Sequence, residues 1–172
     1  MNWAHIHLLI NHIPILGTLF GLLILLWTIW KPQEELRKLG LLVLFLSGLA
    51  AIPVYFTGEP AEDMLGGFAG VSESRIEQHE EAATVTLGFM IFTGVLAAVG
   101  LLNKNERNIN IVTKIVLVIA IITIGLSAWT GNLGGEIRHS EIRSKQDRPT
   151  KSVDTVRKQS HAEDDENDAD DD

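Results

Sequence analysis

The most regular pattern in the chain is the alternation of long uncharged stretches with short charged ones. The stretches without Asp, Glu, Lys or Arg are residues 1–30, 39–58, 82–103 and 115–135. A helix rises about 1.5 Å per residue, so about 20 apolar residues cross a hydrocarbon core of about 30 Å. The pattern therefore predicts an all-α integral membrane four-helix bundle, with spans at about residues 5–30, 36–57, 75–102 and 109–138.

The chain divides by composition into two regions. Residues 1–144 contain the four predicted spans and form the expected bundle. Residues 145–172 hold five Lys and Arg against ten Asp and Glu, and the last ten residues contain eight carboxylates. Such a segment buries too little apolar surface to offset the entropy lost on ordering. We therefore predict a disordered acidic C-terminal tail at 145–172.

Three local features refine the predicted spans. Pro14 lacks the backbone N–H that would bond residue 10, so it should loosen the first helix near Asn11. Gly17 and Gly21 form a GxxxG pattern, which permits close helix packing but also arises by chance. Gly58 and Pro60 are expected to end the second span.

A short motif occurs twice, each time after the second helix of a predicted pair. Phe56-Thr-Gly is followed by Glu62, and Trp129-Thr-Gly is followed by Glu136. A duplicated helical hairpin would produce this pattern, and so would coincidence in so short a motif.

Histidines collect on one side of the predicted bundle. Because the chain reverses direction with each span, the starts of spans one and three lie on the same side of the membrane as the ends of spans two and four. Five of the six histidines lie on that side: His5, His7, His12, His79 and His139. An ionisable residue inside a membrane is a functional candidate, and His12 is the deepest of the five. Small residues behind His79, namely Ala82, Ala83 and Thr86, leave room for a flat group between helices.

The composition restricts the cofactor. The chain has no cysteine, which excludes iron–sulfur clusters and haem attached through Cys-x-x-Cys-His. A histidine from each of two helices is a typical way to hold haem in a helical bundle. We therefore predict a b-type haem held by His12 and His79, with His139 or His7 as alternate ligands.

Carboxylates on the same side of the bundle support a second hypothesis, a non-haem metal site. Glu136-x-x-His139 has the spacing of carboxylate metal sites in helical bundles, and with Glu77 and His79 it could hold non-haem Fe, Cu or Zn. Only one copy of this motif is present, so the acids could instead form a solvated rim. The third hypothesis is a non-catalytic assembly or scaffold subunit of a membrane complex.

Other functions find little support in the sequence. We find no nucleophile triad, no phosphate-binding glycine loop and no basic groove for nucleic acid. The chain is thus expected to be an electron-carrier subunit rather than a stand-alone enzyme. Its expected partners are the lipid bilayer and a membrane or periplasmic redox protein, or further copies of itself.

Basic residues indicate the orientation. Lys31, Arg37 and Lys38 follow the first span, and Lys104, Arg107 and Lys114 follow the third. The positive-inside rule then places the histidines and both termini on the non-cytoplasmic side of a bacterial inner membrane, although basic residues just after span four argue the other way.

Two motifs at opposite ends of the chain resemble those of a known family. His7-Leu-Leu-Ile-Asn-His12-Ile-Pro14-Ile is similar to the His-x4-His-Phe-Pro-Ile opening of a bacterial four-helix membrane-protein family of unknown function. Trp129-Thr-Gly-Asn-Leu-Gly-Gly-Glu resembles that family's Thr-Gly-His-Leu-Gly-Gly element. The resemblance covers about residues 5–142 and implies four helices, a histidine-bearing rim and redox chemistry. Ile13 replaces the family's Phe, and Asn132 stands where a His is common.

Overall fold

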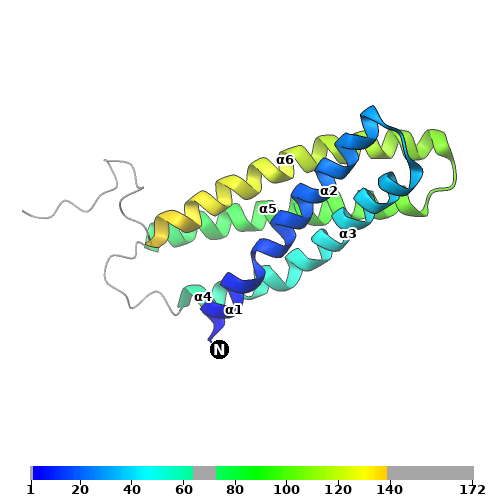
Figure 1. The fold of residues 1–172 in the computed structure, drawn as a ribbon. Coiled ribbons are helices and arrows are strands. Elements are labelled where there is room, and N and C mark those ends of the chain that lie inside the picture. Colours follow the sequence, from blue (N-terminus) through cyan, green and yellow to red (C-terminus); the bar gives the residue numbers. More distant parts are fainter. Residues whose placement is uncertain (1, 64–72, 139–172) are drawn as a thin grey trace, which may run out of the picture. The chain divides into compact units, whose positions relative to one another are not determined.

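The computed structural model describes residues 2–63 and 73–138, and the regular structure in these ranges is entirely helical (Figure 1). The elements are α1 (Trp3–Ile10), α2 (His12–Trp30), α3 (Glu34–Phe56), α4 (Gly58–Asp63), α5 (Glu73–Leu102) and α6 (Glu106–Arg138). The predicted tail at 145–172 and the candidate ligand His139 lie outside these ranges.

Four helical segments are long and apolar enough to cross a membrane. They are Trp3–Trp30, which comprises α1 and α2, then Glu34–Phe56, Ser74–Leu102 and Glu106–Ile137. The uncharged stretches predicted these four segments to within a few residues at each end. Large apolar side chains point outward, and Phe20, Trp27 and Val118 are each more than half exposed. An apolar outer surface of this kind suits a lipid environment better than water.

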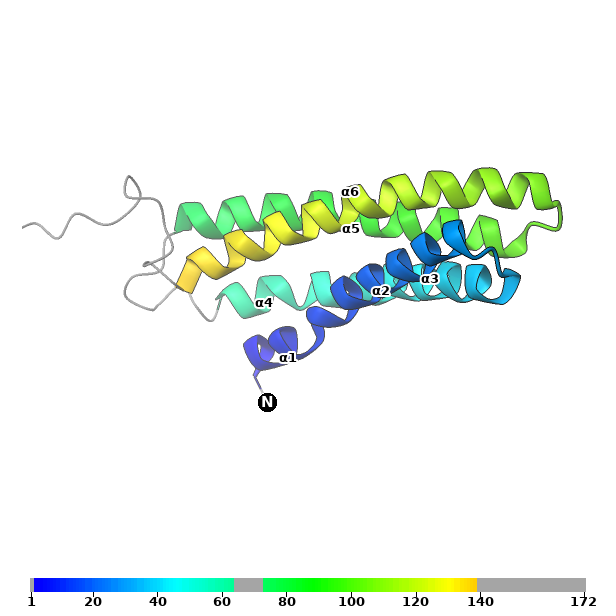
Figure 2. The same cartoon turned by 45° about the horizontal axis from the view of Figure 1, so that its top comes forward.

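The four long segments pack in the order α2, α3, α5 and α6. Contacts join α2 to α3, α3 to α5 and α5 to α6, and further contacts between α6 and α2 close the ring (Figure 2). The main buried cluster includes Leu25, Leu41, Leu44 and Val116. These residues lie toward the end where α2 connects to α3 and α5 to α6. The histidines lie at the opposite end of the bundle, away from this cluster.

Glycines allow the helices to approach closely. A Cβ atom on Gly17 would overlap the side chain of Ser47 in α3, and one on Gly21 would lie 2.7 Å from Leu44 Cγ. The close packing predicted from the GxxxG pattern is thus confirmed. At the crossing of α3 and α5, a Cβ atom on Gly48 would lie only 2.8 Å from the main-chain oxygen of Met90.

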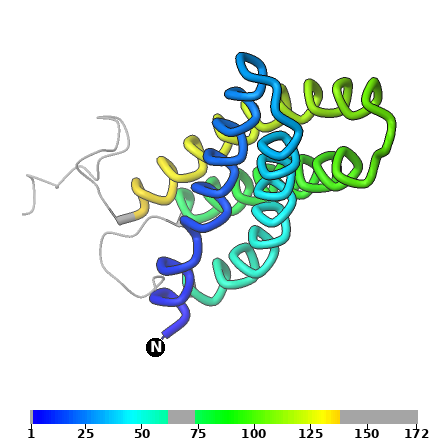
Figure 3. Tube along the Cα trace, turned by 45° about the vertical axis from the view of Figure 1, so that its right-hand side comes forward, coloured from blue at the N-terminus to red at the C-terminus, as the bar shows by residue number. Residues whose placement is uncertain are grey.

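The first span is broken at Asn11, as Pro14 predicted. Helix α1 ends at Ile10 and α2 begins at His12, because Pro14 cannot donate a hydrogen bond to the carbonyl of Ile10. Helix α1 lies against α4, at the end of the molecule where α3 ends (Figures 1 and 3). The break therefore separates the helix that carries His7 from the helix that carries His12.

The prediction that Gly58 and Pro60 end the second span was only partly right. Helix α3 ends at Phe56, but α4 begins after a single turn residue and contains both Gly58 and Pro60. Pro60 is the third residue of α4, where backbone N–H groups have no partner within the helix. Its missing N–H therefore does not prevent a new helix from starting there.

Candidate functional site

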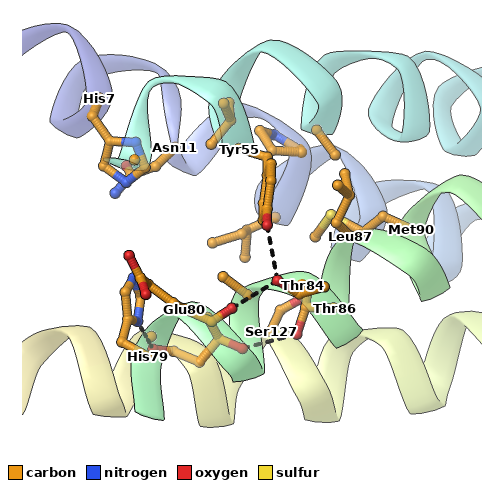
Figure 4. Close-up of a pocket in the computed structure, with 18 of the residues that line it drawn as sticks. His7, Asn11, Tyr55, His79, Glu80, Thr84, Thr86, Leu87, Met90 and Ser127 are labelled. Atoms are coloured by element: carbon orange, nitrogen blue, oxygen red, sulfur yellow. Dashed lines mark hydrogen bonds between the residues drawn. The ribbon is translucent and has the colours of Figure 1, made fainter. Parts of the chain in front are cut away.

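A cavity of about 520 Å³ opens among the helices at the histidine-bearing end of the bundle. Figure 4 shows His7 on α1 and His79 on α5 at opposite sides of this cavity. Its lining continues along α5 to Leu87 and Met90, which lie about 12–16 Å beyond His79 at 1.5 Å per residue. The cavity thus has a polar mouth and a more apolar interior.

His79 is anchored to α6 by its Nδ1 atom. This atom lies 3.1 Å from the main-chain oxygen of Thr130. A carbonyl oxygen can only accept a hydrogen bond, so Nδ1 must carry the hydrogen. Nε2, on the other side of the ring, points away from Thr130. The ring also lies close to Gly134, where an added Cβ atom would be 3.1 Å from His79 Cε1.

His7 is anchored in the same way to the junction of α3 and α4. Its Nδ1 atom lies 3.0 Å from Thr57 Oγ1. The Thr57 hydroxyl donates its only hydrogen to the carbonyl of Val54, at 2.7 Å. The hydroxyl must therefore accept from His7, which again places the hydrogen on Nδ1 and leaves a lone pair on Nε2.

Two further polar groups at the cavity are a paired tyrosine hydroxyl and a buried amide oxygen. Thr84 donates to the carbonyl of Glu80 at 2.9 Å, so the Tyr55 hydroxyl, 2.9 Å from Thr84 Oγ1, must donate to Thr84 (Figure 4). Asn11 Oδ1 is buried and has no hydrogen-bond partner within the described part of the chain.

The cavity contains two of the predicted ligands, His7 and His79, but not His12. His12 is exposed, as is His5. The break at Asn11 places His5 on α1 and His12 on α2. His7, predicted only as an alternate, is the histidine that shares the cavity with His79.

The predicted carboxylate ligands are placed differently. Glu136 Oε2 lies 2.9 Å from Arg75 Nη1, and Glu136 Oε1 accepts a hydrogen bond from Asn132 Nδ2 at 2.8 Å. Glu77 is exposed. Across residues 2–63 and 73–138, no three His, Asp or Glu side chains converge as a metal site would require. Glu136 therefore joins α6 to α5 through Arg75.

Several residues of the site were not predicted from the sequence, among them Asn11, Tyr55, Thr57 and Thr130. Thr57 and Thr130 occupy the same position in the repeated aromatic-Thr-Gly motif. The repeat could thus have identified both anchors, whereas nothing in the sequence distinguishes Asn11 and Tyr55.

Comparison with known proteins adds no assignment. The chain matches no protein-family model, no curated protein and no solved structure.

Proposed function

We propose that this protein is a multi-pass membrane protein that binds b-type haem through His7 and His79 and transfers electrons. The observation that carries the proposal is the pair of anchored imidazoles on opposite sides of one cavity. Metal-binding histidines typically donate the second ring N–H to a carbonyl or another acceptor, which fixes the ring and its tautomer. Both rings here have that arrangement.

The residues of the cavity fit a haem group. Two neutral imidazoles supply the donor set of a bis-histidine haem, and the volume of about 520 Å³ is typical of sites for organic cofactors. Pro14, Ile15, Leu87 and Met90 supply apolar surface for a macrocycle. When bound, haem supplies one-electron redox chemistry. The chain holds the two rings and surrounds the inner part of the cavity with apolar side chains.

A repeated structural relation supports a duplicated hairpin as the origin of this site. The contact from His7 to Thr57 spans 50 residues, and that from His79 to Thr130 spans 51. In both cases a histidine on the first helix of a pair contacts the threonine of the aromatic-Thr-Gly motif near the end of the second. A duplication gives a central ligand one imidazole from each half.

The proposed location is the bacterial inner membrane, with the histidines on the non-cytoplasmic side. The basic residues between the two helices of each pair favour this orientation. A carrier in this position would exchange electrons with a membrane or periplasmic redox protein or with another copy of the chain. The accessibility of single cysteines introduced at Ser74 and Asn108 to a membrane-impermeant reagent tests it, because Ser74 should be labelled in intact spheroplasts and Asn108 should not.

An absorbance spectrum of protein purified from haem-replete cells tests the function. We expect a Soret band and sharp alpha and beta bands after reduction. His7→Ala and His79→Ala should each change these bands, while His12→Ala should not, because His12 is exposed outside the cavity. Absence of a Soret band from well-folded protein would reject the proposal.

The same pair of anchored imidazoles also suits one second candidate, a non-haem Fe, Cu or Zn protein. His7 and His79 would supply imidazole ligands, which suit all three metals. Elemental analysis separates the candidates, since about one metal per chain without porphyrin would support this one. Neither haem nor metal in the purified protein would favour an assembly or scaffold role.

A further inference from the structure

We propose that His79 is the fixed ligand of the site and His7 the exchangeable one, so that a small neutral molecule can take the position that His7 leaves. This inference rests on the proposed haem site. It adds ligand binding to electron transfer, because displacement of one imidazole opens a coordination position on the metal.

The helices that carry the two histidines are held very differently. Helix α1 has eight residues, none of them buried, and it is separated from α2 by the break at Asn11. Its Leu8 and Leu9 are 65% and 63% exposed, so lipid rather than protein surrounds them in a membrane. A short segment with few buried contacts opens locally at a lower free energy than the rest of a fold.

His79 lies on a helix that is packed along its length. Helix α5 has 30 residues and contacts both α3 and α6. Ala82 and Thr86, which follow His79 by three and seven residues, are 1% and 7% exposed. Movement of His79 away from the cavity would require α5 to leave two long neighbouring helices, whereas movement of His7 requires α1 to turn at Asn11 and to leave the short helix α4.

The hydrogen bonds that anchor the two histidines also differ in rigidity, and again His79 is held more firmly than His7. His79 donates to a main-chain carbonyl, which is held by the helix, whereas His7 donates to a side-chain hydroxyl. Asn11, at the hinge, has a buried side-chain oxygen with no partner in the described residues. Opening of α1 would expose that oxygen to water, so the closed arrangement is disfavoured at the point where α1 turns.

The exchange itself is a ligand substitution. With haem bound, His7 Nε2 would give up its place on the iron to the incoming neutral molecule, and His7 would leave as a neutral imidazole. No electron is transferred. The exchange would need no reductant beyond the one added to make the iron ferrous before a ligand such as carbon monoxide is supplied.

Hydrogen exchange on the ligand-free chain tests the mobility of α1 without any cofactor. In phosphatidylcholine nanodiscs, we expect the amides of His7–Asn11 to exchange at least about tenfold faster than those of His79–Ala83. Both sets lie one helical turn or more from a helix start, so the comparison is matched. Equal protection of the two segments would overturn the inference.

Carbon monoxide binding to the reduced, haem-loaded protein tests the exchange. The wild type and the control His12→Ala should bind carbon monoxide at a rate that reaches a plateau with concentration, because His7 must leave first. His7→Ala should bind it at a rate that rises linearly, and His79→Ala should lose haem. Failure of the wild type to bind carbon monoxide while His7→Ala binds it would overturn the inference and leave the haem proposal intact. If the purified protein contained no haem, the proposed function would be rejected. Hydrogen exchange on the ligand-free chain would still measure whether α1 or α5 opens more readily.

Discussion

The Nδ1 atom of His79 lies 3.1 Å from the main-chain oxygen of Thr130, which is 51 residues further along the chain. His7 has a matching relation to Thr57, at 3.0 Å and a separation of 50 residues. Each contact ties the first helix of a pair to the end of the second. The acceptor is a carbonyl in one case and a hydroxyl in the other, so only the His7 anchor can be removed by a side-chain substitution.

Removal of the Thr57 hydroxyl should weaken cofactor binding. Thr57→Val has nearly the same shape but leaves the Nδ1–H of His7 without its acceptor, so the ring loses its fixed orientation. We expect haem affinity to fall about 10–100-fold, as for other residues that orient metal ligands. Titration of the haem-free protein with haem, followed by absorbance, measures the change.

Two controls accompany this substitution. Thr57→Ser keeps the hydroxyl and should bind haem nearly as the wild type does. Thr84→Val removes a hydroxyl that contacts Tyr55 rather than a histidine, and it too should bind normally. Equal affinities for Thr57→Val and Thr57→Ser would show that the hydroxyl does not position His7.

The helices and their packing were largely predictable from the sequence, because they follow from local properties. Uncharged length defines a span, a proline within it removes a specific backbone hydrogen bond, and paired glycines permit close approach. The break at Asn11 and the contacts of Gly17 and Gly21 with α3 agree with those rules. Helix α4 escaped prediction because Pro60 falls where its missing N–H has no consequence.

The site was less predictable, because it depends on the directions of side chains after the chain bends. Depth along a continuous helix favoured His12 over His7, but the bend at Asn11 separates the two residues and leaves His12 exposed. Glu136 had the spacing of a metal ligand, yet its partner Arg75 is 61 positions away in the sequence. Sequence spacing could not reveal either relation.

Gly134→Ala should disturb His79 directly. The new Cβ atom would lie 3.1 Å from Cε1 and 3.3 Å from Nδ1 of the ring, so the ring must shift by a few tenths of an ångström. We expect weaker haem binding and a broadened alpha band. Gly125→Ala is the matched control, because Gly125 also lies on α6, does not line the cavity, and its Cβ atom would meet nothing within 4 Å. Equal spectra for the two variants would contradict the close fit of His79.

The ion pair of Arg75 and Glu136 should stabilise the fold without serving as a metal ligand. The two side chains are 14% and 13% exposed and join α5 to α6 near the mouth of the cavity. A double-mutant cycle with Arg75→Met and Glu136→Gln, measured by unfolding in mixed micelles, should give a coupling free energy of about 0.5–3 kcal/mol. The metal or haem content of Glu136→Gln should equal that of the wild type. A loss of cofactor in this variant with unchanged stability would instead support the carboxylate metal site.

Gly48→Ala should destabilise the crossing of α3 and α5. An alanine gains about 1 kcal/mol over glycine within a helix, which alone would stabilise the variant. However, its Cβ atom would lie 2.8 Å from the main-chain oxygen of Met90 and 3.2 Å from the Cα atom of Gly94, and neither backbone atom can move without separating the helices. Overpacking of this kind typically costs about 1–3 kcal/mol, and contact with backbone atoms favours the upper part of that range. We therefore expect a net loss of about 1–2 kcal/mol in the free energy of unfolding, measured by unfolding in mixed micelles.

Gly88→Ala on α5 has open space around its Cβ position and should equal or slightly exceed the stability of the wild type. If the two variants had the same free energy of unfolding, α3 and α5 would have to lie further apart than the contact between Gly48 and Gly94 indicates.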